Sequence, residues 1–151
     1  MKYIKIIISG GGGFIGGNLI RLLLNSNYNI LNLDKLTYAA DIKSLNVFNK
    51  YKNYQFKKID ISNYSEIYKI INDFKPDKII NLAAESHVDR SIESSKQFIK
   101  TNVEGTVSLL EASLKFYQKN NYKKFLFHHV STDEVFGDLI ENNQNSFKET
   151  T

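Results

Sequence analysis

The sequence predicts an α/β fold in which helices cover both faces of a doubly wound parallel sheet. Short runs rich in Ile, Val, Tyr and Phe alternate with helical patterns, a glycine-rich turn follows the first run, and polar residues follow the later runs. The strands that we expect cover residues 3–9, 29–33, 54–59, 78–82 and 124–130. This alternation gives right-handed βαβ units, so the carboxyl ends of all strands lie at one edge of a sheet that is truncated after about five strands.

The spacing of apolar residues predicts helices over residues 14–26, 41–48, 65–74 and 96–120, followed by a polar tail without periodicity. Asp41 and Ser65 are the expected N-caps of the second and third helices, and Pro76 follows the end of the third. Gly105 lies inside the last helix, where it costs about 1 kcal/mol relative to alanine. That helix carries an apolar stripe made of Ile99, Val103, Val107, Leu110, Leu114 and Tyr117.

The composition is that of a globular protein, with 42% hydrophobic and 13% aromatic residues in a chain long enough for one domain. The absence of cysteine excludes disulfides and thiolate sites, and it fits a reducing compartment. The net charge of +4 comes from lysines spread along the chain, which is more typical of a solvated surface than of a nucleic-acid interface. Neither a signal peptide nor an apolar run of roughly 20 residues is present. We therefore expect a cytoplasmic protein that binds neither nucleic acid nor a membrane.

Glycines follow the first expected strand directly. Gly10, Gly13 and Gly16 form a GxxGxxG pattern, and Gly11, Gly13 and Gly16 form a GxGxxG pattern. Residues without a Cβ atom permit a tight turn, a close approach of the backbone to a pyrophosphate, and close packing of helix on strand. The N-terminus of the following helix offers free N–H groups to phosphates. Four consecutive glycines also suit a flexible turn, but the strand before and the helix after favour a Rossmann-type dinucleotide site.

The second expected strand leads into Asp34, whose carboxylate can accept hydrogen bonds from the adenosine ribose hydroxyls. The same charge would repel a 2′-phosphate, so the sequence favours NAD over NADP as the cofactor. Lys35, the next residue, weakens that preference.

Polar or small residues also follow the third and fourth strands. Asp60 precedes Ile61, and an acid there can bind an adenine edge, although a lone Asp is more often a turn or cap residue. Ala83 and Ala84 would let a flat cofactor lie against the backbone. Polar residues crowd the loop after these alanines, and an ordinary polar loop is the alternative interpretation.

The fifth strand is followed by Ser131, Thr132, Asp133 and Glu134. Two adjacent acids can act as separate general acid and base if their environments move their pKa values apart. An N-cap with acids in the first helical turn would give the same pattern. The neighbouring histidines have no further ligand at useful spacing, so no metal site is predicted.

Five segments together resemble the extended short-chain dehydrogenase/reductase family, and within it the NAD-dependent epimerase/dehydratase group that includes dehydratases of dTDP-glucose. The segments cover residues 10–16, 32–39, 82–92, 101–102 and 128–138, in the family's order and spacing. The segments that begin at Leu82 and Ser131 are highly specific. Gly12, where the family usually has Ala, and Phe136, where it usually has Tyr, are small departures.

The resemblance implies a nucleotide-sugar dehydratase that holds NAD tightly and acts on dTDP-glucose, as a homodimer when full-length. Hydride leaves C4 of the sugar, the C5 proton is removed, water leaves from C6, and hydride returns to C6. By resemblance, Thr132 lies near the 4-hydroxyl, Asp133 protonates the departing C6 hydroxyl, and Glu134 is the base at C5. Ser86, His87 and Thr132 would contact the substrate. The cofactor contacts implied are Gly10, Gly13, Phe14, Ile15, Gly16, Asp34, Lys35, Leu36, Thr37, Asp60, Ile61, Leu82, Ala83, Ala84, Glu85, Ser86 and Thr101.

The family oxidises C4 with a Tyr-x-x-x-Lys pair located shortly after the segment at which this chain ends. We therefore expect residues 1–151 to form an incomplete NAD-binding domain that lacks the C-terminal substrate domain and is inactive alone. Tyr54 and Lys58 match the spacing. On a strand, however, four residues span roughly 13 Å, whereas the chemistry needs one helical turn.

Two alternatives to this assignment stay open. A UDP-sugar dehydratase or an epimerase would share the glycine turn and Asp34, although epimerases typically lack the adjacent acids, and the segment around Glu85 favours dTDP. A non-catalytic NAD-binding remnant would share the same site. The coding DNA beyond Thr151 would distinguish a remnant from part of an enzyme.

Overall fold

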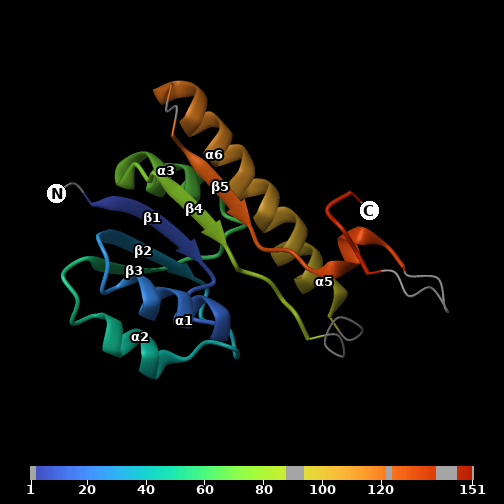
Figure 1. The fold of residues 1–151 in the computed structure, drawn as a ribbon, viewed down its shortest axis with the longest axis horizontal. Coiled ribbons are helices and arrows are strands. Elements are labelled where there is room, and N and C mark those ends of the chain that lie inside the picture. Colours follow the sequence, from blue (N-terminus) through green and yellow to red (C-terminus); the bar gives the residue numbers. More distant parts are fainter. Residues whose placement is uncertain (1–2, 88–93, 122–123, 139–145, 151) are drawn as a thin grey trace.

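A single parallel sheet forms the centre of the molecule. The computed structural model describes residues 3–87, 94–121, 124–138 and 146–150. Its strands lie in the order β3-β2-β1-β4-β5 (Figure 1). They are β1 (Ile4–Ser9), β2 (Tyr28–Asp34), β3 (Tyr54–Lys58), β4 (Lys78–Asn81) and β5 (Leu126–His129). Each pair of neighbours is parallel, which confirms the predicted fold class and brings the carboxyl ends of the strands to one edge.

Helices cover both faces of the sheet, because alternate residues of each strand point to opposite sides. On one face, Ile6 and Ile8 of β1 pack with α1 (Phe14–Leu23) and α2 (Ile42–Phe48). On the other face, Ile7 packs with α3 (Tyr64–Phe74) and α6 (Thr106–Asn120). The buried side chains thus form two clusters, one on each side of β1.

Two predicted helix boundaries differ from the structure. The first helix ends at Leu23 and not near residue 26. The cap of α3 is Asn63 and not Ser65, because the Asn63 side chain accepts from the Glu66 N–H at 3.3 Å and donates to the Glu66 carboxylate at 3.3 Å. This reciprocal pair satisfies the first turn of the helix, and Ser65 lies inside that turn. The expected cap Asp41 does accept from the N–H groups of Lys43 and Ser44.

The predicted long helix contains a π-helical turn. It consists of α5 (Ser95–Phe98), the π segment η1 (Ile99–Gly105) and α6, in direct succession. Gly105 packs against Ile61, and a Cβ atom at this glycine would lie 2.6 Å from the Ile61 Cγ1 atom. The residues of η1 and α6 that are buried are Thr101, Gly105, Leu109, Ala112, Ser113 and Phe116. The apolar stripe from Ile99 to Tyr117 lies instead on the outer face, with side chains 44–56% exposed.

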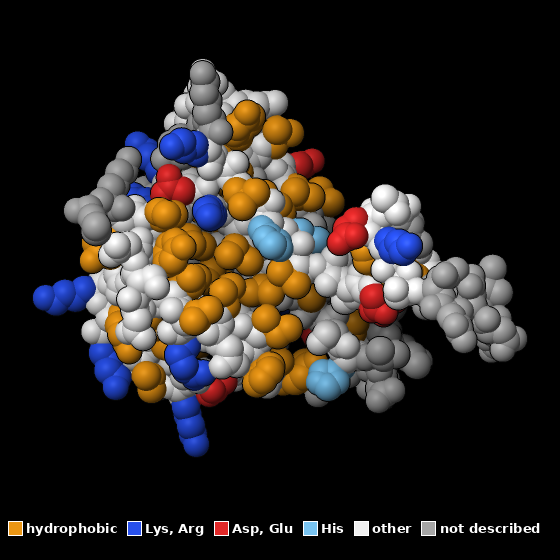
Figure 2. Space-filling model, in the orientation of Figure 1, with side chains coloured by type: hydrophobic (Ala, Val, Ile, Leu, Met, Phe, Trp, Pro, Cys, Tyr) orange, Lys and Arg blue, Asp and Glu red, His pale blue; other side chains and the backbone are white. Residues whose placement is uncertain are grey.

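Strand β5 forms one edge of the described sheet, and part of its surface is apolar. Leu126 is 48% exposed, and Val130, just after the strand, is 41% exposed. Hydrophobic side chains gather around β4 and β5 in the space-filling view (Figure 2). In the described part of the chain, no helix has the length and apolar character required to cross a membrane.

The two candidate caps of α3 can be tested by substitution. We expect Asn63→Ala to lower the free energy of unfolding by about 1 kcal/mol, because it leaves N–H groups of the first turn without their side-chain acceptor. Ser65→Ala should change it by less than about 0.5 kcal/mol, since alanine is the better helix former. Urea unfolding followed by circular dichroism measures both values. A larger loss for Ser65→Ala than for Asn63→Ala would show that Asn63 is not the cap.

Candidate functional site

A cleft opens at the carboxyl edge of the sheet and encloses about 570 Å³ of space, including its open mouth. Residues that follow β1, β2, β3 and β4 form its walls, together with one side chain from η1. Twelve of the residues singled out from the sequence line it: Gly10, Gly13, Asp34, Lys35, Thr37, Asp60, Ile61, Leu82, Ala83, Ala84, Glu85 and Thr101. Those that do not line it are Phe14, Ile15, Gly16, Leu36, Ser86, His87, Thr132, Asp133 and Glu134.

The glycine turn brings the start of α1 close to the strands. Gly10 has φ of +80°, and a Cβ atom there would lie 2.6 Å from the backbone nitrogen of Ala83. At Gly16 a Cβ atom would press on the Gly10 carbonyl and lie 2.8 Å from the Gly11 Cα. Gly13 is the N-cap of α1, and no side chain caps this end of the helix. The turn therefore presents backbone, and not side chains, to the cleft.

Two backbone N–H groups hold the carboxylate of Asp34. Its Oδ2 atom accepts from the Gly12 N–H at 2.8 Å, and its Oδ1 atom accepts from the Leu36 N–H at 2.7 Å. Leu36 adopts a left-handed backbone with φ of 60°, and its side chain packs against the core below α1 and α2. This turn fixes a negative charge at the end of β2, beside the glycine turn.

Asp60 lies two residues after β3, the strand next to β2, and its carboxylate is close to two lysines. Its Oδ2 atom is 2.9 Å from the Nζ atom of Lys35 and 4.0 Å from that of Lys100. Burial alone would raise the pKa of Asp60, but the bonds from Lys35 and Ser62 outweigh it and hold the pKa below its usual value. Asp60 is therefore ionised at neutral pH.

The loop after β4 is held by Asn102, a residue that the sequence analysis placed only within a family motif. Its side chain accepts from the Glu85 N–H at 2.8 Å and donates to the Glu85 carbonyl at 3.0 Å. Asn102 lies in η1, directly after the cleft residue Thr101. The only sequence signal for this contact was a polar residue within the predicted long helix. The π turn that directs the Asn102 side chain toward the loop leaves no recognisable pattern in the sequence.

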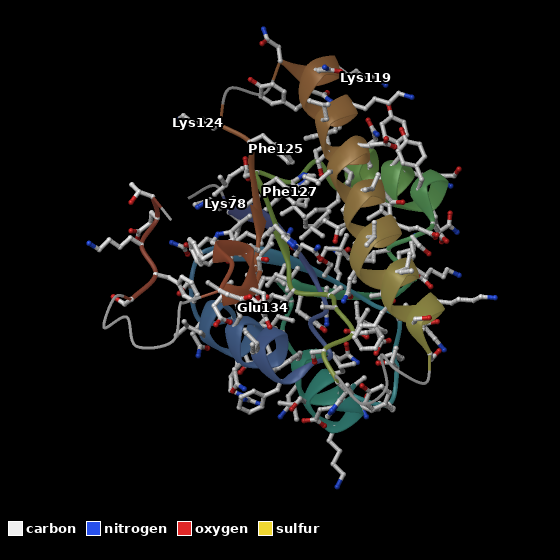
Figure 3. The ribbon with its side chains drawn as sticks, turned by 90° about the vertical axis from the view of Figure 1, so that its right-hand side faces the viewer. Lys78, Lys119, Lys124, Phe125, Phe127 and Glu134 are labelled. Atoms are coloured by element: carbon white, nitrogen blue, oxygen red, sulfur yellow. The ribbon has the colours of Figure 1, made fainter. Side chains whose placement is uncertain are left out.

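The predicted acid pair lies apart from the cleft, after β5. Asp133 and Glu134 begin the 3-10 helix η2 (Asp133–Phe136), with Thr132 at its N-cap position, and all three residues are exposed. A hydrogen bond from the Thr132 hydroxyl is the main cause that lowers the pKa of Glu134. Glu134, labelled in Figure 3, lies beyond the carboxyl end of β5. Both acids lie in the first turn of this short helix, but the Thr132 side chain makes no capping hydrogen bond to it, so the capped turn considered from the sequence is only partly formed.

Tyr54 and Lys58 both lie on β3, as predicted, and they do not form a catalytic pair. The Tyr54 hydroxyl accepts from the Asn32 side chain at 2.9 Å inside the core. Burial raises the pKa of Tyr54, which is the opposite of what a general base requires.

The strand order, with its crossover between β1 and β4 and a glycine turn beside it, defines a Rossmann-type domain. Proteins with this topology bind ligands at that crossover, where the cleft lies. The sequence model of the GDP-mannose 4,6 dehydratase family matches residues 7–151, and the chain belongs to this family.

Individual proteins of known sequence or structure are also similar. The chain is 43% identical over 151 residues to a dTDP-glucose 4,6-dehydratase of Neisseria gonorrhoeae, covering 97% of this chain and 43% of that protein. The dTDP-glucose 4,6-dehydratase of Bacillus anthracis, solved in complex with NAD, has a TM-score of 0.74 and 33% identity, covering 95% of this chain and 42% of that chain. The UDP-glucose 4-epimerase of Thermotoga maritima, solved with UDP-glucose, has a TM-score of 0.76 and 27% identity, covering 91% of this chain and 41% of that chain. The chain spans about two fifths of the length of the curated relatives that it matches.

Neighbouring glycines of α1 allow a matched test of the close approach. Gly16→Ala should lower the free energy of unfolding by roughly 1–3 kcal/mol, because its Cβ atom would meet backbone atoms that have no room to move. Gly17→Ala should raise it by up to about 1 kcal/mol, because its Cβ atom would lie 3.6 Å from the Gly11 carbonyl and alanine favours the helix. Thermal unfolding of both variants measures the difference. Equal effects would contradict the packing described for Gly16.

Proposed function

We propose that this chain is the NAD-binding part of a nucleotide-sugar dehydratase that converts dTDP-glucose into dTDP-4-keto-6-deoxyglucose. The main support is one observation. The glycine turn, the fixed carboxylate of Asp34 at the end of β2, and the alanine rim after β4, formed by Ala83 and Ala84, all line the same cleft. The 43% identity to a dTDP-glucose 4,6-dehydratase and the NAD complex of the Bacillus anthracis enzyme support the substrate and the cofactor.

The cleft residues fit a dinucleotide. The glycine turn and the uncapped start of α1 would hold the pyrophosphate, since both offer backbone N–H groups and no side chain. Asp34 would hold the ribose hydroxyls, because each of its oxygens keeps a lone pair beyond its backbone bond. Ile61 would contact the adenine ring, while Ala83 and Ala84 would let the cofactor lie against the loop after β4. When bound, NAD supplies reversible hydride transfer.

The acids after β5 would perform the proton transfers of the dehydration. Glu134, whose lowered pKa keeps it ionised at neutral pH, would be the base that takes the C5 proton. Asp133 would give a proton to the departing C6 hydroxyl, and the Thr132 hydroxyl would orient the sugar near its 4-hydroxyl. Glu85, Ser86 and His87 follow the alanine rim and would extend this polar surface toward the substrate.

A sugar epimerase is the second candidate, because the Thermotoga maritima epimerase matches the fold at 27% identity. Epimerisation does not remove water, so it needs no acid beside Glu134. The adjacent Asp133 therefore favours a dehydratase.

We also propose that the complete enzyme is a homodimer that covers the exposed stripe of η1 and α6. Six large apolar side chains aligned on one outer helix face make a contiguous surface of the kind buried between subunits.

In a completed enzyme, Leu110→Glu should shift the sedimentation coefficient from that of a dimer toward that of a monomer. Lys119→Glu, in the last turn of the same helix (Figure 3), should leave the dimer intact, because Lys119 is not one of the stripe residues. An unchanged dimer in Leu110→Glu would contradict the proposal.

The proposed reaction can be tested with a chimera. The one Tyr-x-x-x-Lys match in the sequence, Tyr54 and Lys58, lies on strand β3, so we expect this chain alone to bind NAD but to form no 4-keto sugar. Fused to the remaining part of the Neisseria gonorrhoeae relative, it should convert dTDP-glucose with release of water.

Single-turnover absorbance of this chimera separates the steps of the reaction. Asp133→Asn should slow water loss at least about tenfold while oxidation at C4 survives. Asp73→Asn, an exposed acid of α3 that lies outside the cleft and outside the family segments, is the control.

Three results would contradict this assignment. Turnover by the chain alone would mean that another residue replaces the missing base. An inactive chimera that still binds NAD would point to a non-catalytic cofactor-binding role. Equal loss of oxidation and dehydration in Asp133→Asn would contradict the separate role of that acid.

A further inference from the structure

The two carboxylate oxygens of Asp60 have different partners. The Oδ1 atom accepts from the backbone N–H of Ser62 at 3.0 Å and from its hydroxyl at 2.8 Å. The Oδ2 atom lies 2.9 Å from the Lys35 Nζ atom. Because Ser62 fixes the carboxylate, Asp60 can hold the Lys35 ammonium group in one place. Both side chains line the cleft.

This ion pair is partly shielded from solvent. The Lys35 side chain is 35% exposed and that of Asp60 is 24% exposed. Such a pair is screened less than one on the open surface. The pKa of Asp60 lies below its usual value, so the carboxylate stays charged at neutral pH and keeps its hold on Lys35. Lys100, at 4.0 Å from the same oxygen and 51% exposed, is a weaker partner.

The charges around the adenosine end of the cleft balance one another. Asp34 and Asp60 contribute two negative charges, and Lys35 and Lys100 contribute two positive charges. Asp34 is fixed by backbone donors and opposes a second anion beside it. Lys35, the next residue in the chain, has the opposite tendency, since a free ammonium group attracts a phosphate.

On the basis of the proposed function, we propose that Asp60 is a specificity residue for the cofactor: it holds the Lys35 ammonium group and thereby withholds it from the 2′-phosphate that distinguishes NADP from NAD. Asp34 excludes this phosphate by repulsion, and Asp60 removes the neighbouring group that would otherwise attract it. The preference for NAD then depends on two acids from two strands, and not on Asp34 alone.

A double-mutant cycle on the 151-residue chain tests this proposal. Asp60→Asn removes the charge but keeps the Oδ1 acceptor for Ser62, and Lys35→Met keeps the length of the side chain without its charge. Calorimetry at low salt gives the dissociation constants for NAD and NADP in the wild type, the two single variants and the double variant. Lys57→Met removes a lysine of β3 that lies outside the cleft and is the control for net charge.

We expect Asp60→Asn to raise the affinity for NADP relative to NAD by about fivefold, as one new charge-assisted contact to a phosphate would. In the Asp60→Asn background, Lys35→Met should abolish this gain, and added salt should reduce it. In the wild-type background, Lys35→Met should leave the ratio of the two affinities within about twofold, because the ammonium group is already held. Lys57→Met should also leave it unchanged.

Several outcomes would overturn the inference. A gain in NADP affinity that persists in the double variant would show that Lys35 is not the group released. Equal changes in both affinities in Asp60→Asn would show that Asp60 acts on binding in general. A large loss of NADP affinity in the single variant Lys35→Met would show that Lys35 already binds NADP in the wild type, and that Asp60 does not withhold it. If the wild type binds neither nucleotide, the proposed cofactor itself is wrong and the inference falls with it.

Discussion

The arrangement of the cleft depends on how closely the Gly10–Gly16 turn approaches the ends of three strands. The Gly10 N–H donates to the Leu33 carbonyl of β2 at 2.8 Å, and Gly10 itself packs on the backbone of Ala83 after β4. Gly12 then donates to Asp34. Side chains at Gly10 or Gly16 would separate these backbones. The shape of the turn therefore sets the distance between α1 and the sheet, and with it the position of the acid that faces the cleft.

Buried polar residues connect this edge of the sheet to the long helix. Ser9 and Asn81 are fully buried on β1 and β4, where the Ser9 hydroxyl donates to the Asn81 side chain at 2.6 Å. The Asn81 amide lies 3.1 Å from the His129 Nδ1 atom of β5, and its carbonyl oxygen accepts from the Ala83 N–H. Unpaired polar groups in the core are costly, so such a network favours one arrangement of the three strands. This network holds the start of the short loop at Ala83, and the two hydrogen bonds between the Asn102 side chain and the Glu85 backbone hold its other end.

The sequence was sufficient for the strands, their common edge and most of the cleft wall, because parallel strands bury nearly continuous apolar runs and the residues after them must meet at one edge. It was insufficient where two residues compete for one role. Asn63 and Ser65 are both good caps, and only the pairing of Asn63 with Glu66 decides between them. The π turn of η1 was also missed, because an inserted residue in a helix leaves the apolar spacing on either side intact. The apolar stripe was found correctly as a pattern, but a pattern does not reveal whether the core or another surface covers it.

The strand order explains why the predicted site residues divide into two groups. Residues after β2 and β3 lie on one side of the crossover, and Thr132 to Glu134 follow β5 on the other side, with the alanine rim of β4 between them. A dinucleotide that extends along this edge would have its adenosine end beside the charged side chains of Asp34, Asp60 and Lys35. Its reactive end would lie toward β5. General acid and base chemistry is most effective where water is excluded, yet η2 is exposed and lies next to the apolar surface of β5. The proposed adenosine half thus lies in a lined cleft, whereas the acids proposed for the chemistry lie on an exposed segment beside an apolar strand surface.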